Sequence, residues 1–138
     1  MFGRGKSLLV VLLFVLASAS GFADDVTGAE TILCTSVQAT VCYFDGDCEI
    51  GAPWNWGVPQ FIEVDFTNKK LSTTKASHEL RETPFKNLER AEGLIFLQGV
   101  ERGRAFSIVI EELSGIMSAA IARDQVTVSV FGACTPAP

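Results

Sequence analysis

The last third of the chain alternates apolar and polar residues in a pattern that predicts antiparallel strands. Residues 94–134 fall into four strand-like segments separated by turn signals. In the second segment Phe106, Ile108 and Ile110 occupy every other position, which places them on one face of a strand. Gly103 predicts a three-residue hairpin loop before this segment, with the glycine in the left-handed conformation. We expect this four-stranded meander to be the framework of the fold.

One segment of the meander has two interpretations. Five apolar residues of 111–123 also satisfy the helical spacing i, i+3, i+4, i+7, i+8, and these are Leu113, Ile116, Met117, Ala120 and Ile121. A helix would hold Gly115 in its interior, at a cost of about 1 kcal/mol relative to alanine. Because the neighbouring segments are spaced like a meander, the pattern favours a strand here.

The preceding part of the chain predicts two hairpins. Residues 31–44 are rich in β-branched and aromatic side chains and predict one strand or two short ones. An Asp-Gly step follows and turns the chain into a return strand at 48–50. Residues 60–66 alternate in polarity and 71–75 return, which predicts the second hairpin.

Two connecting segments separate these strands. Residues 51–59 contain two prolines and two glycines, which predicts irregular structure, and they carry both tryptophans, Trp54 and Trp56. Residues 76–92 form the most polar segment. Within it, Pro84 breaks any longer helix, and residues 85–91 are compatible with a short helical turn.

These elements predict an all-β protein. We expect a single small antiparallel barrel or sandwich of about seven to nine strands, spanning residues 24–138. The pattern leaves the choice between barrel and sandwich open.

The N-terminal residues predict a secretory signal peptide at 1–23. Arg4 and Lys6 precede an apolar run at 8–16, and small residues follow up to a cleavage point after Ala23. The apolar run is shorter than the roughly 20 residues that span a bilayer. We therefore expect a periplasmic or secreted protein with no stable membrane insertion after cleavage.

The charge of the mature chain limits the classes of partner. Cleavage removes Arg4 and Lys6 and no acid, which takes the net charge from −5 to −7. Binding to nucleic acid draws on clustered Lys and Arg, and binding to anionic lipid does the same, so an acidic chain argues against both. The sequence carries no signal for a cofactor.

Four cysteines lie in the exported part and predict two disulfides. Three connectivities are open, and we favour Cys42–Cys48 across the first hairpin together with Cys34–Cys134 between the first and last strands. A bridge that closes a loop of about 100 residues stabilises by about 4–5 kcal/mol in the chain-entropy model. Zinc is disfavoured because no CxxC pair is present.

Signals for catalysis or metal binding are weak. His78 is the only imidazole, and it lies in a polar segment without a nucleophile elbow. Asp45 and Asp47 resemble the start of a calcium loop but lack its remaining ligands, and turn chemistry explains them equally well. Glu63 and Asp65 have the separation of a glycosidase pair, which the solvent face of any strand also provides. We predict no catalytic residue and no metal site.

The candidates for recognition are two tryptophans and two arginines. Trp54 and Trp56 lie in the irregular loop, where flat rings either contact a ligand or partner or cover the open end of the β-core. Arg102 and Arg104 flank Gly103 and either hold an anion or pair with neighbouring glutamates, and the second interpretation is the more ordinary one.

Four short patterns resemble a group of small exported proteobacterial proteins with no assigned activity. They are VDF at 64–66, LQG at 97–99 with Gln98 and Gly99, GRAFS at 103–107 and FGACT at 131–135. The resemblance implies an exported, disulfide-containing β-domain and carries no site residues with it.

The function that we predict is a non-catalytic exported binding module for a small ligand or for another extracytoplasmic protein. An inhibitor of an extracytoplasmic enzyme, such as a lysozyme or a protease, is the alternative, because a small, acidic, disulfide-linked scaffold suits that role. A small hydrolase is the third hypothesis.

Overall fold

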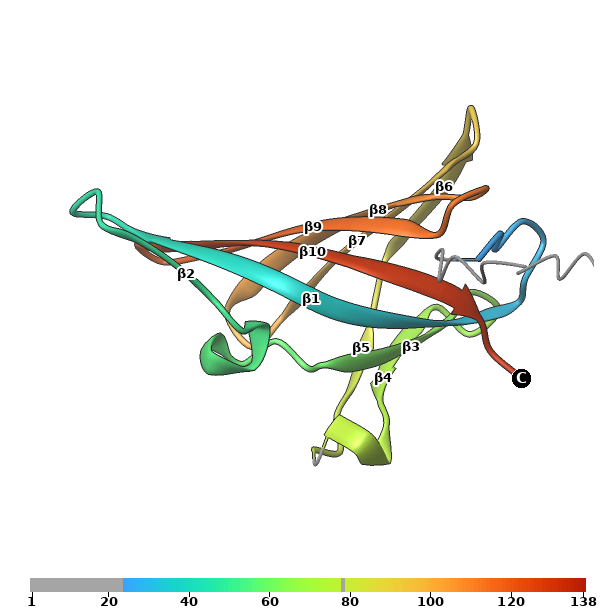
Figure 1. Ribbon diagram of the computed structural model, residues 1–138, viewed down its shortest axis with the longest axis horizontal. Helices are drawn as coiled ribbons and strands as arrows, with labels where there is room; N and C mark the ends of the chain where they lie inside the picture. Colours follow the sequence, from blue (N-terminus) through green and yellow to red (C-terminus); the bar gives the residue numbers. More distant parts are fainter. Residues whose placement is uncertain (1–23, 78) are drawn as a thin grey trace, which may run out of the picture.

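The strands form one antiparallel sheet that curls into a half-barrel (Figure 1). The computed structural model describes residues 24–77 and 79–138, so the predicted signal peptide and His78 lie outside the described residues. Nine strands follow the order β5-β4-β3-β1-β10-β9-β8-β7-β6, and the short β2 pairs with β1 beside β3. The all-β prediction is confirmed.

The strand bounds follow the predicted segments except for β5 and β6, which lie in the polar segment 76–92 where no strand was expected. The bounds are β1 (Thr31–Tyr43), β2 (Cys48–Gly51), β3 (Phe61–Asp65), β4 (Lys70–Thr73), β5 (Glu82–Pro84), β6 (Asn87–Ala91), β7 (Leu94–Glu101), β8 (Arg104–Glu111), β9 (Ile116–Arg123) and β10 (Val126–Pro136). Two short 3-10 helices, η1 (Pro53–Trp56) and η2 (Lys75–Ser77), interrupt the connections.

The meander β7-β8-β9-β10 is confirmed as a block of sequential neighbours. The segment with two interpretations is the strand β9. The loop between β7 and β8 has two residues rather than the predicted three, because Glu101 pairs directly with Arg104. Arg102 and Gly103 have φ values of 47° and 75°, and a two-residue loop with two positive φ values matches the right-handed twist of the strands.

The curl of the sheet depends on the link between β5 and β6. The N–H of Phe85 donates to the carbonyl of Lys69 at 3.0 Å, and the next N–H, that of Lys86, donates to the carbonyl of Gln98 at 3.0 Å. Consecutive residues therefore bond to opposite ends of the strand order, which draws β4 towards β7. The short helical turn considered at 85–91 does not form, because the backbone of β6 is satisfied by its ladder with β7.

The core lies on the concave face of the sheet. Its fully buried side chains alternate along the strands and include Ile32, Val41, Val64, Ile95, Leu97, Ile110 and Val130. Each such side chain contributes about 1.5–3 kcal/mol relative to leaving it exposed. A bulge between Ser36 and Gln38 shifts the alternation of β1, so Ser36 and Ala39 both face inward and Val37 is 65% exposed.

Both predicted disulfides are confirmed. Cys34–Cys134 joins directly paired residues of β1 and β10 inside the core, and Cys42–Cys48 joins β1 to β2 near the hairpin tip. Two disulfides suit an oxidising, extracytoplasmic environment. Within residues 24–77 and 79–138, no helix has the length and apolar character needed to cross a bilayer.

Candidate functional site

The concave side of the half-barrel contains a small cavity of about 70 Å³. Its wall is mainly apolar and combines side chains of the meander with side chains of β3, β4 and the loop after η1, among them Val58, Ile62, Leu71, Phe106, Ile108 and Met117. Core residues alternate along the strands of the meander, so the same periodicity that builds the core builds this part of the wall.

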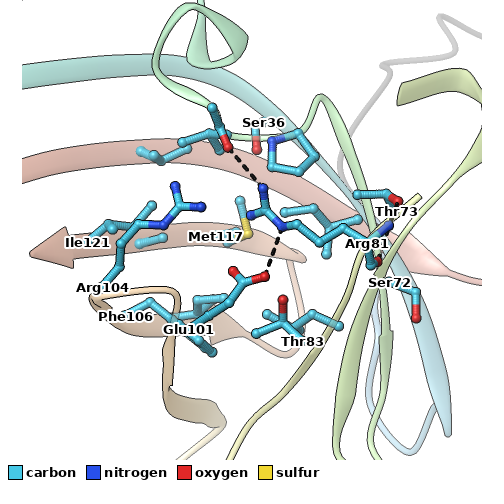
Figure 2. A pocket seen from close by; sticks show the side chains of 18 residues that line it. Ser36, Ser72, Thr73, Arg81, Thr83, Glu101, Arg104, Phe106, Met117 and Ile121 are labelled. Carbon is cyan, nitrogen blue, oxygen red and sulfur yellow. Dashed lines mark hydrogen bonds and ion pairs between the residues drawn. The ribbon is translucent and has the colours of Figure 1, made fainter. Parts of the chain in front are cut away.

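An ion pair closes one side of the cavity. Arg81 Nε lies 3.1 Å from Glu101 Oε1, and the two side chains are only 14% and 13% exposed. Arg81 Nη1 also donates to the carbonyl of Gly57 at 3.3 Å (Figure 2). Arg81 therefore links the segment before β5 to the end of β7 and to the loop after η1.

Ser36 contributes a polar atom without a partner. Its side chain is 2% exposed and lines the cavity, and its hydroxyl has no hydrogen-bond partner among the residues that the structure describes. A buried hydroxyl left unsatisfied costs about 1–3 kcal/mol. The bulge in β1 is what turns Ser36 inward at this point.

A larger groove of about 800 Å³ adjoins the cavity. Gly57, Arg104 and Ile121 line both spaces and form the wall that they share. The groove lies where the β7–β8 turn, the β9–β10 turn and η1 meet, and its polar and aromatic lining consists of Tyr43, Asn55, Trp56, Arg102, Arg104, Arg123 and Asp124. We call this space the arginine groove.

The arginine groove collects every arginine that lacks a carboxylate partner in the described part of the chain. Of the five arginines described, Arg81 and Arg90 form ion pairs, and the other three, Arg102, Arg104 and Arg123, line the groove. The expectation that Arg102 and Arg104 pair with neighbouring glutamates is wrong, because the adjacent Glu101 turns inward to Arg81. In Figure 2, the guanidinium groups of Arg81 and Arg104 point into the same pocket.

Trp56 lies in the arginine groove and also packs against the core. Gly51 makes room for it, because a Cβ at that position would lie 3.1 Å from the Trp56 ring. Gly57 follows with φ 73° and ends η1, and a Cβ on it would lie 3.7 Å from Arg104 Nη1. The left-handed glycine thus allows the loop to turn beside the Arg104 side chain.

The structure brings together three of the four residues singled out from the sequence. Trp56, Arg102 and Arg104 line one groove, whereas Trp54 is 53% exposed and lies outside its lining. Sequence reasoning missed Ser36 and Arg81. Nothing in their local pattern marks them, since the burial of Ser36 depends on a bulge and that of Arg81 on a partner 20 residues away in sequence.

The other candidates have ordinary structural surroundings. Asp65 accepts hydrogen bonds from the backbone N and the side-chain Nδ2 of Asn68 at 2.9 and 2.7 Å, and these bonds hold its pKa below the usual 3.8. Asp65 thus closes the β3–β4 turn. Asp45 similarly accepts from the N–H of Asp47 at 3.0 Å. Residues 24–77 and 79–138 contain no cluster of three His, Cys, Asp or Glu side chains suited to a metal ion.

Comparison of the chain with protein-family models, with curated proteins and with solved structures found no match. The resemblance to small exported proteins therefore stays a prediction, and the function has to be argued from the groove itself.

Proposed function

We propose that the protein is a non-catalytic exported binding module, periplasmic or secreted, that holds a small ligand in the arginine groove. One observation carries the proposal: a groove of about 800 Å³, next to an apolar cavity, is bordered by three arginines without carboxylate partners in the described chain. Small-molecule sites typically have volumes of about 300–1,000 Å³ and combine apolar walls with a few convergent polar groups.

The lining of the arginine groove favours binding over catalysis. Its members include one carboxylate, Asp124, and among the described residues that line it there is no histidine, cysteine or glutamate. General acid–base chemistry draws on two titratable groups with different roles, and nucleophilic chemistry draws on a nucleophile beside a base. The groove instead offers hydrogen-bond donors and an indole ring, which orient a ligand without transforming it.

Native mass spectrometry of the mature protein, purified from exporting cells, tests this proposal. We expect a small-molecule adduct on a protein that carries two disulfides. A Trp56→Ala variant should lose the adduct and a Trp54→Ala variant should keep it, because only Trp56 lines the groove. A wild-type protein without an adduct, or equal retention by both variants, would contradict the proposal.

A second candidate is binding to another exported protein, including inhibition of an extracytoplasmic enzyme such as a lysozyme or a protease. The β1–β2 hairpin projects from one end of the sheet (Figure 1), and the Cys42–Cys48 disulfide braces it. Phe44 at its tip is 84% exposed, and Ile50 is 70% exposed. An exposed aromatic side chain on a pre-organised loop is a typical anchor for a protein interface.

A Phe44→Ser variant separates the two candidates. If the hairpin binds a target enzyme, this variant loses the stoichiometric complex with that enzyme in size-exclusion chromatography and keeps the small-molecule adduct. If the hairpin has no such role, the variant and the wild-type protein behave alike in both measurements.

A further inference from the structure

The charges around the arginine groove indicate what kind of ligand it takes. The whole chain is acidic, with a net charge of −5, yet three arginines and one aspartate line this groove. The two remaining arginines that the structure describes are neutralised: Arg81 by Glu101, and Arg90 by Glu112 at 3.0 Å. The groove is thus a local cationic site on an acidic protein, which favours an anion.

Arg104 is the arginine best placed to hold the charge of the ligand. It lines both the groove and the inner cavity, is half-buried, and lies beside Gly57 where the chain makes its left-handed turn. Arg81 points into the same pocket but is paired with Glu101, so Arg104 is the guanidinium there that has no carboxylate partner (Figure 2). A planar guanidinium binds a carboxylate or sulfonate through two parallel hydrogen bonds, which gives orientation as well as attraction.

The remaining walls indicate a ligand with a flat apolar body. Trp56 and Tyr43 contribute rings to the groove, and Val41, Val126 and Val128 contribute aliphatic surface. Aromatic rings stack favourably on an indole face. A purely polar anion would leave these walls in contact with water and gain nothing from them.

The inner cavity and the groove differ greatly in size. The cavity has a volume of about 70 Å³ and the groove one of about 800 Å³. The body of the ligand therefore lies in the groove. The unpartnered Ser36 hydroxyl, buried in the cavity wall, is suited to an ordered water or to a short polar substituent of the ligand.

We propose that the ligand of the arginine groove is a small aromatic organic acid in its anionic form. The acid group binds Arg104, with Arg102 and Arg123 adding positive charge, and the ring lies against Trp56. This inference rests on the proposed function and names the ligand class of the same site.

Calorimetric titration of the mature protein with matched probes tests the inference. The probes are 1-naphthoate, its neutral twin 1-naphthamide, which has the same ring, and decanoate, which has the charge but no ring. We expect 1-naphthoate to bind at least about tenfold more tightly than either of the others. Arg104→Gln should remove this preference by weakening 1-naphthoate at least about tenfold while changing 1-naphthamide by less than about twofold.

Two further variants keep the test decisive if Arg104→Gln fails to fold. Arg123→Gln removes a groove charge at the exposed end of β9 and should weaken 1-naphthoate by about two- to fivefold. Lys75→Gln in η2 removes a charge outside the groove lining and should leave all three affinities unchanged.

The outcomes distinguish failure of the inference from failure of the proposed function. Equal binding of 1-naphthoate and 1-naphthamide, each dependent on Trp56, would overturn the anion assignment and leave a small-molecule binding module. Decanoate binding as tightly as 1-naphthoate would overturn the aromatic assignment alone. If no probe binds and the purified protein carries no adduct, both the inference and the proposed function are wrong.

Discussion

The two parts of the sheet on either side of the β1–β10 pair differ in regularity. On one side, β7, β8 and β9 each have 8 residues, the edge strand β6 has 5, and the turns at β7–β8 and β9–β10 are tight. In contrast, β2 to β5 have 4, 5, 4 and 3 residues and are separated by 3-10 turns and irregular loops. The groove uses both parts: the regular part supplies the arginines at its turns, and the irregular part supplies Trp56.

This difference separates stability from recognition. The long strands pair in a fixed register and contribute most of the core side chains. Substitutions there should therefore lower the free energy of unfolding. Substitutions in the irregular part that leave the core intact should change binding more than stability. The four predictions below test this division, from the largest expected effect to the smallest.

The two disulfides should contribute unequally to stability. Cys34–Cys134 closes a loop of 100 residues inside the framework, and Cys42–Cys48 closes one of 6 residues at the hairpin. The chain-entropy model gives about 4.7 kcal/mol for the first and about 2 kcal/mol for the second. Guanidinium unfolding of the Cys34→Ala/Cys134→Ala and Cys42→Ala/Cys48→Ala variants measures both losses. A larger loss for the hairpin pair would contradict the division.

Two glycines of the sheet should respond differently to an added methyl group. Gly132 lies opposite the β1 bulge, where a Cβ would overlap the carbonyl oxygen of Thr35, so Gly132→Ala should destabilise by about 1–3 kcal/mol. At Gly51 the Cβ would meet side-chain atoms alone, the Trp56 ring at 3.1 Å and Asn55 Nδ2 at 3.7 Å. Gly51→Ala should therefore cost less than about 1 kcal/mol and instead shift the tryptophan emission and weaken 1-naphthoate binding. Urea unfolding and fluorescence measure these effects. Equal losses of stability in Gly132→Ala and Gly51→Ala would contradict the expected difference between the two parts of the sheet.

The Arg81–Glu101 ion pair should contribute more than an exposed pair. Its side chains are 14% and 13% exposed, whereas Lys70 and Glu82, 3.2 Å apart, are 40% and 69% exposed. Glu101→Gln leaves the largely buried guanidinium with only the more exposed Glu79, 3.4 Å away, as a counter-charge and should cost about 1–3 kcal/mol, and Glu82→Gln should cost less than about 0.5 kcal/mol. Thermal unfolding of the two variants side by side tests this difference.

The smallest expected effect concerns Asp65 and acid pH. Backbone and side-chain hydrogen bonds from Asn68 lower the pKa of Asp65 below 3.8, so the folded state favours the carboxylate. The resulting stabilisation is present above the unfolded pKa and is lost as the pH falls through the lowered folded pKa. Wild-type protein and Asp65→Asn should therefore differ in urea midpoint at pH 7 and converge in strong acid. If the difference in urea midpoint between the two proteins grew on acidification, the proposed stabilisation by the Asp65 carboxylate would be contradicted.

Local patterns predicted the regular part of the fold well. Alternation of apolar residues predicted β8 and β10, turn residues separated the strands, and the positions of the cysteines in the predicted strands led to both disulfides. The curl into a half-barrel was not predictable, because it depends on Phe85 and Lys86 bonding to opposite ends of the strand order. Local sequence propensity does not indicate which distant carbonyl groups accept hydrogen bonds from these two residues.

The groove was predictable only in part. Trp56, Arg102 and Arg104 were candidates because of residue type and loop context, and the fold brings them together. Trp54 has the same type and context, and only the direction of η1 separates it from Trp56. The partner of Arg81 could not be predicted, because an ion pair depends on which turns meet across the open side of the half-barrel.

Nitrogen-15 correlation NMR of the mature protein, titrated with 1-naphthoate, tests the central claim most directly. The two tryptophan indole N–H groups report separately on the groove and on the neighbouring exposed surface. We expect a saturable shift of the Trp56 indole together with the Gly57 and Gly103 amides, while the Trp54 indole stays in place. Equal shifts of both indoles, or shifts centred on the outward-facing Ser118, would contradict this claim.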